Sequence, residues 1–139
     1  MKCRRAVIDL PLRLTLTLLI LSLSLPLADA ALQMQERDAA MRECGVQAEA
    51  LLDTATVVYF QGGGSSRHVP LTLPSSTSLT VTEGGLIIEH EGKALGTAMA
   101  NNPSFPLFHD HPITLKDGDM VELTAVEREG IHGVMVRIL

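Results

Sequence analysis

The strongest constraint on this chain is its N-terminal segment, where basic residues precede a leucine-rich run. Lys2, Arg4 and Arg5 come first, and after Arg13 residues 14–25 are apolar apart from interleaved Thr and Ser. A basic stretch followed by an apolar stretch is typical of a secretory signal peptide. The first residues therefore predict export from the cytoplasm.

The end of the apolar run indicates where this signal would be removed. Pro26 interrupts the run, and Ala28-Asp29-Ala30 supplies the small side chains that signal peptidase accepts. We predict that residues 1–30 are a cleavable signal peptide and that the mature protein starts at Ala31. The alternative is an uncleaved anchor, but a span needs about 20 apolar residues, and about a dozen precede Pro26. We therefore expect no membrane span after cleavage and a location in the periplasm or the secreted fraction.

The charge of the predicted mature chain restricts its partners. Removal of residues 1–30 takes away four of the 11 basic residues and two of the 16 acids, which leaves 7 − 14 = −7. An acidic domain is repelled by phosphate backbones, so we expect no nucleic-acid partner. Only three Phe, one Tyr and no Trp are present, so aromatic surfaces for stacking bases or sugars are scarce.

Cysteine usage indicates the compartment. Cys3 would leave with the signal, so Cys44 is the only thiol of the predicted mature chain and no intramolecular disulfide can form. Small domains secreted by animals usually depend on several disulfides. The composition therefore favours a bacterial periplasm and leaves the oligomeric state open.

Residues 31–54 have the spacing of an amphipathic helix. Apolar side chains recur at steps of three, four and seven, which places them on one helical face. They are Met34, Met41, Cys44, Ala48, Leu51 and Leu52. The pattern predicts one N-terminal helix whose apolar face needs a partner surface.

Residues 55–139 consist of short β-rich runs divided by turn residues. The runs are 56–61, 69–73, 78–82, 86–90, 93–99, 113–116, 120–126 and 134–139. No helical pattern separates them, so we predict a mainly β fold of the α+β class. Its architecture would be one N-terminal amphipathic helix followed by a small antiparallel β-sandwich or OB/SH3-like barrel of six to seven short strands.

The clearest turn signal lies near the C-terminal part of the chain. Asp117-Gly118-Asp119 tolerates positive φ and predicts a hairpin between 113–116 and 120–126. The sequence LKDGDMVEL at 115–123 resembles the last hairpin of many small β-barrels of the OB or SH3 type. That resemblance bears on the fold and not on function.

His109-Asp110-His111 is a candidate metal site. Histidines two residues apart on an extended segment project from the same face and could bind one Zn²⁺ or Cu²⁺ together. A stable site needs three or four ligands, so Asp110 or a further histidine would have to lie close by. The alternative, which Pro112 favours, is that both are solvated loop side chains. No other cofactor is expected.

The glycine-rich segment 62–66 does not predict an enzyme. It lacks the lysine of a phosphate-binding loop, and Ser65 or Ser66 with His68 lacks the Gly-x-Ser-x-Gly elbow of a hydrolase. A hydrolase is therefore a distant alternative, and no catalytic residues are predicted.

Residues 101–108 are the candidate interaction segment. Phe105, Leu107 and Phe108 bring two of the few aromatic residues beside prolines in one loop. Exposed, pre-organised aromatic side chains often dominate binding energy. We therefore expect a small exported binding module that contacts another protein of the cell envelope through this loop or through an open sheet edge. The alternative is a metal-binding protein that uses His109 and His111. The opposing interpretation of Phe105 and Phe108 is that both rings turn inward and cap the core.

Overall fold

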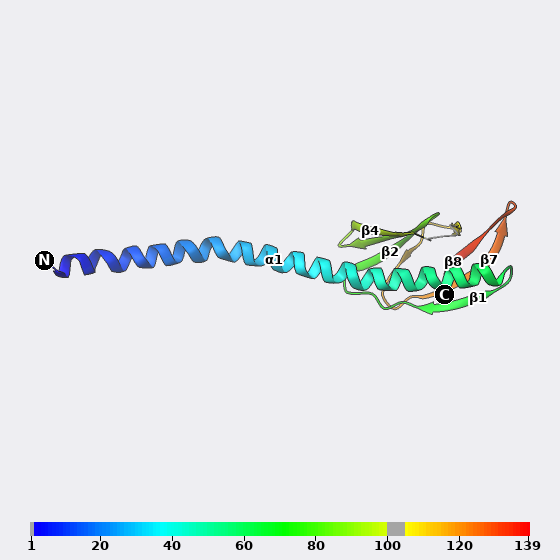
Figure 1. Ribbon diagram of the computed structural model, residues 1–139, viewed down its shortest axis with the longest axis horizontal. Coiled ribbons are helices and arrows are strands. Elements are labelled where there is room, and N and C mark those ends of the chain that lie inside the picture. The colour runs from blue at the N-terminus through cyan, green and yellow to red at the C-terminus, as the bar shows by residue number, and fades with distance from the viewer. Residues whose placement is uncertain (1, 100–104) are drawn as a thin grey trace. The chain divides into compact units, whose positions relative to one another are not determined.

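The computed structural model describes residues 2–99 and 105–139, so part of the candidate interaction segment, residues 101–104, lies outside the described residues. The chain divides into two compact units, Met1–Arg37 and Asp38–Leu139. Helix α1, Lys2–Gln61, runs from the first unit into the second (Figure 1). The unit from Asp38 onward contains the strands and the core.

Helix α1 is longer at both ends than the predicted helix of 31–54. It contains Pro26 without ending there, and it continues to Gln61, so the predicted strand at 56–61 is wrong. Val58 is fully buried and Tyr59 packs against the core, which continues the helical face of Leu51 and Ala55. Thr56, Val57 and Val58 are β-branched, which lowers their helix propensity by only fractions of a kcal/mol each. Burial of the helical face outweighs that preference.

Within residues 2–99 and 105–139, eight strands follow α1 and form two four-stranded sheets. They are β1 (Ser66–Pro70), β2 (Thr77–Thr82), β3 (Gly85–His90), β4 (Lys93–Met99), β5 (Leu107–Phe108), β6 (Thr114–Leu115), β7 (Met120–Arg128) and β8 (Ile131–Ile138). One sheet has the order β1-β7-β8-β5 and the other β4-β3-β2-β6. The predicted α+β class with one N-terminal helix and many short strands is confirmed, whereas the described strands do not close into a barrel. Strand β5 was not predicted, and it pairs with β8 in parallel rather than antiparallel orientation.

The predicted hairpin around Gly118 is a turn between sheets. Gly118 has the expected positive φ of 84°, and the Asp119 N–H donates to the Lys116 carbonyl at 3.2 Å. However, β6 pairs with β2 and β7 pairs with β1 and β8, so the strands on either side of the turn diverge. The Gly118 N–H donates to the Leu71 carbonyl at 3.0 Å, which ties the turn to the β1–β2 connection. The barrel-type hairpin is therefore not formed.

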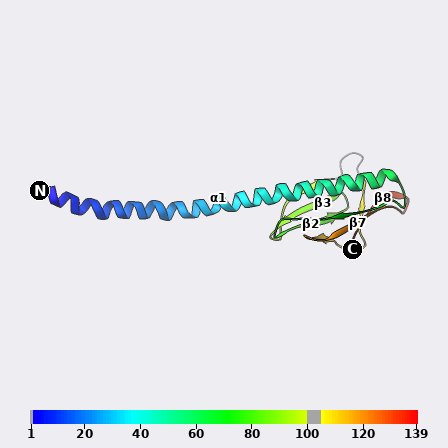
Figure 2. The same cartoon turned by 90° about the horizontal axis from the view of Figure 1, so that it is seen from below.

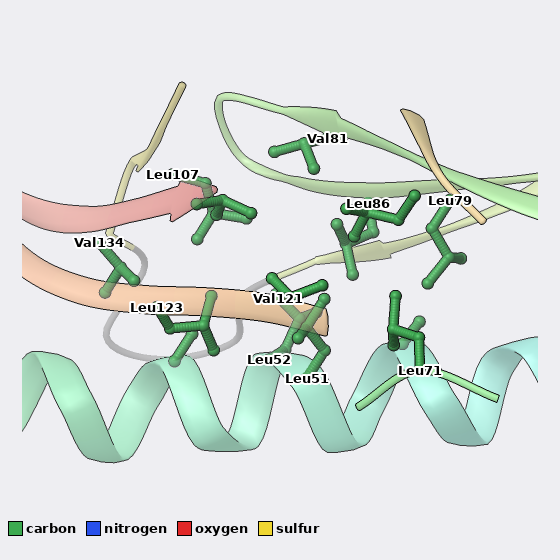
Figure 3. Packing of buried hydrophobic residues seen from close by; sticks show 14 of the residues in the cluster. Leu51, Leu52, Leu71, Leu79, Val81, Leu86, Leu107, Val121, Leu123 and Val134 are labelled. Atoms are coloured by element: carbon green, nitrogen blue, oxygen red, sulfur yellow. The ribbon is translucent and has the colours of Figure 1, made fainter. Parts of the chain in front are cut away.

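The core lies between the last turns of α1 and the two sheets. These turns run alongside the strands in both orientations (Figures 1 and 2). Leu51 and Leu52 point from α1 toward Val121 and Leu123 of β7 (Figure 3). Burial of one such leucine contributes roughly 1.5–3 kcal/mol, so this face holds the helix on the strands.

The predicted apolar face of α1 is confirmed from Cys44 onward and differs before it. Cys44 and Ala48 are fully buried, but Met34 is exposed. Met41 is also partly exposed, although its Cε lies 2.6 Å from the point where a Cβ on Gly96 would stand. Glycine at position 96 of β4 therefore allows Met41 to approach the strand.

Candidate protein-contact surface

Three of the four aromatic residues of the chain form one aromatic cluster, Tyr59, Phe60 and Phe105. The Tyr59 ring stacks on Phe105 with centroids 4.7 Å apart, and it meets Phe60 edge to face at 5.7 Å. Phe108 lies instead against Gly133 of β8, where an added Cβ would stand 2.6 Å from the Phe108 ring. Packing of the end of α1 against the segment before β5 thus brings three of the scarce aromatic rings together.

Phe105 and Leu107 are core residues. Each is 3 % exposed, and Leu107 pairs with Val134 in the β5–β8 ladder. A side chain buried to this degree presents no surface to a partner, so the hypothesis that these two make a protein contact is corrected. The inward orientation weighed for Phe105 is the one observed, because its ring fills the space beside Tyr59. Of the three residues predicted to make the contact, only Phe108, which is half-buried, keeps exposed surface.

Charged side chains frame the remaining surface of Phe108. The Arg128 guanidinium carbon lies 5.8 Å from the centroid of the Phe108 ring, within the range of a cation–π contact. The same guanidinium is 3.1 Å from the Asp110 carboxylate, and Arg137 reaches the other carboxylate oxygen at 3.6 Å. The Arg128–Asp110–Arg137 group therefore forms a polar border next to Phe108.

A hollow of about 250 Å³ lies beside Phe60. The end of α1 contributes Tyr59 and Phe60 to its wall, and β7 and β8 contribute Ala125, Val126, Glu127, His132 and Gly133. Phe60 is 66 % exposed, and Val57, one helical turn earlier, is also exposed. The His132 Nε2 and a Glu127 carboxylate oxygen stand 4.0 Å apart at the hollow. An apolar ring beside a small hollow with a charged margin is suited to receiving a side chain of another protein.

Sequence reasoning missed Phe60 because residues 56–61 were assigned to a strand. A usable signal was present, since Leu51, Leu52, Ala55 and Val58 extend the helical spacing beyond residue 54. Phe60 is two residues after Val58, about 200° around the helix, which is the side away from the core. Continuation of the helical pattern would have placed this ring on the surface.

His109 and His111 are not joined by a third ligand in the described part of the chain. His109 is half-buried and His111 is exposed, and residues 2–99 and 105–139 contain no group of three or more His, Cys, Asp or Glu side chains arranged to hold a metal ion. The Asp110 carboxylate between them is engaged by Arg128 and Arg137. Two imidazoles alone make a weak site.

Ser66 and His68 do not form a nucleophile–base pair. The Ser66 hydroxyl lies 3.4 Å from the Glu122 carboxylate, and the His68 Nε2 lies 3.5 Å from the same oxygen. An activated serine needs the base itself at its hydroxyl. Because Glu122 stands between the two side chains, this arrangement lacks the geometry of a hydrolase.

Comparisons with models of protein families, with curated proteins and with solved structures give no match to this chain.

Proposed function

We propose that the unit Asp38–Leu139 works outside the cytoplasm as a binding module for another protein of the cell envelope. The contact would be made by Phe60 and the hollow beside it. The observation that carries the proposal is the 66 % exposure of Phe60 in a chain with only four aromatic residues. Aromatic anchors of this kind supply most of the binding energy at protein interfaces.

The surroundings of Phe60 support this assignment. Protein interfaces usually have an apolar centre with a polar, solvent-accessible rim. Phe60 and Val57 provide the apolar part, and Glu127 and His132 provide ionisable groups at the hollow beside it. The apolar N-terminal part of α1, which is compatible with a signal sequence, supports a location outside the cytoplasm.

A Phe60→Ala substitution tests the proposal. We expect it to weaken binding of the envelope partner by at least about 30-fold, the effect of losing roughly 2 kcal/mol at an interface hot spot. The free energy of unfolding should hardly change, because the ring is exposed. A photo-cross-linking amino acid at position 60 would first capture the partner in intact envelopes, and binding of that partner would then be measured with purified proteins.

Val46→Ala is the matched control for this experiment. Val46 lies on the same helix and has nearly the same exposure, 64 %, but it does not line the hollow. It should leave partner binding unchanged. Equal binding by the Phe60→Ala variant and the unsubstituted protein would reject Phe60 as the anchor.

A further inference from the structure

The apolar segment at the start of α1 is exposed around the whole helix. All the Leu and Ile side chains from Leu10 to Leu27 are at least 51 % exposed. Successive residues are about 100° apart, so Leu18, Leu19 and Ile20 already point in three directions. A helix that is apolar on every side is typical of a membrane span rather than of a surface helix in water.

The polar side chains within this segment satisfy their own hydrogen bonds. Each hydroxyl donates to a backbone carbonyl three or four residues earlier, at distances of 2.7–3.1 Å. The donors are Thr15, Thr17, Ser22 and Ser24. An unpaired hydroxyl in hydrocarbon costs several kcal/mol, and these bonds remove that cost. The segment therefore needs no water along its sides.

The length of the segment fits a bilayer. Residues 10–28 number 28 − 10 + 1 = 19, and at 1.5 Å per residue they extend about 28 Å, close to the roughly 30 Å of a hydrocarbon core. Leu27 and Ala28 continue the apolar stretch beyond Pro26, and the helix does not end at this proline. Arg13 is the only charged residue inside it. The Arg13 guanidinium lies 3.7 Å from the carboxylate of Asp9, which is one helical turn nearer the N-terminus. Arg13 lies near the N-terminal end of the segment, so its long side chain can reach the lipid headgroups.

The expected cleavage site lies inside the helix. Ala28-Asp29-Ala30 is far from the end of α1 at Gln61, and helix continues on both sides of it. A peptidase binds the residues around the scissile bond in an extended form, so cleavage after Ala30 requires α1 to unwind at that point. Helix formation is cooperative, and a turn in the middle of a long helix opens less readily than one at its end.

We infer that residues 10–28 stay in the mature protein and cross a lipid bilayer once. Lys2, Arg4 and Arg5 precede the span, and basic residues favour the cytoplasmic side. The N-terminus is therefore cytoplasmic and residues 31–139 lie outside. The signal peptide expected from the sequence is therefore kept as a membrane anchor and is not cleaved after Ala30. This inference does not depend on the proposed protein contact at Phe60.

The full chain expressed in bacterial cells gives a direct test. Membranes are washed at alkaline pH and floated in a density gradient, and the intact mass of the protein is measured. We expect the protein to float and its mass to include residues 10–28. An N-terminus at Ala31, or release of the protein into the soluble fraction, would overturn the inference.

Two arginine substitutions locate the span. Leu19→Arg puts a charge at its middle and should abolish flotation, whereas Leu32→Arg, beyond the span on the same helix, should not. Both leucines are exposed, so neither variant disturbs the core. Flotation of the Leu19→Arg variant equal to that of the unsubstituted chain would mean that the segment does not lie in the bilayer.

A cysteine at an exposed position reports the orientation. Ser75→Cys should react with a membrane-impermeant thiol reagent in cells whose cytoplasmic membrane is intact, because Ser75 is exposed on the outer side of the inferred span. Labelling that appears only after the cells are permeabilised would contradict the orientation.

Discussion

Tyr59 and Phe105 stack nearly parallel, with ring centroids 4.7 Å apart and ring planes at 11°. Tyr59 lies in the last turn of α1, and Phe105 lies just before β5. The stack fastens the end of the helix to a segment far away in the sequence. It also makes Phe105 part of the core and leaves Phe60, the neighbour of Tyr59, on the surface.

Replacement of Phe105 by Ala should lower the free energy of unfolding by about 3–5 kcal/mol, because the substitution empties a buried site beside Tyr59. Phe108→Ala should cost less than about 2 kcal/mol, since its ring is only half-buried. Chemical denaturation of the purified variants measures both values. An equal cost at the two positions would contradict the observed difference in burial.

Two glycine substitutions should have opposite effects. A Cβ at Gly133 would stand 2.6 Å from both the Phe108 ring and the Pro106 carbonyl oxygen, so Gly133→Ala should destabilise the protein by roughly 1–3 kcal/mol. Gly45 lies inside α1 with nothing within 4 Å of its Cβ position, so Gly45→Ala should stabilise by about 0.5–1 kcal/mol. If both variants shift the denaturation midpoint in the same direction, the packing described around these two glycines is wrong.

Cys44 should be inert to thiol reagents in the native protein because it is fully buried. A Cys3→Ser background leaves it as the only thiol. We expect labelling only in denaturant, whereas an added Asp53→Cys thiol at an exposed helix position should label at once. Rapid native labelling of the Cys3→Ser variant would place Cys44 outside the core.

Zinc should bind weakly to the His109 and His111 pair, because no third His, Cys, Asp or Glu joins them within residues 2–99 and 105–139. Titration calorimetry of the purified protein measures this binding, and the double variant His109→Ala/His111→Ala is the control. Tight binding that the double variant abolishes would instead support the metal-binding alternative.

The strands were largely predictable from the sequence, and the candidate site was not. Predicted 93–99 coincides with β4, and predicted 78–82 and 86–90 each differ from β2 and β3 by one residue. These three strands follow one another with short turns between them, and each pairs with the next. The surface around Phe60 and His132 joins α1 to β8, so no local pattern contains it.

The sequence alone determined where the backbone can turn and which helical face is apolar. Gly118 turns with positive φ because glycine lacks a Cβ, and the spacing from Cys44 to Leu52 places one face of α1 in the core. Only the tertiary structure decided that residues 56–61 are helical, that the strands form two sheets, and that Phe105 points inward while Phe60 points outward. These outcomes depend on burial against residues distant in sequence, and that free energy exceeds the small local preferences that a sequence pattern expresses.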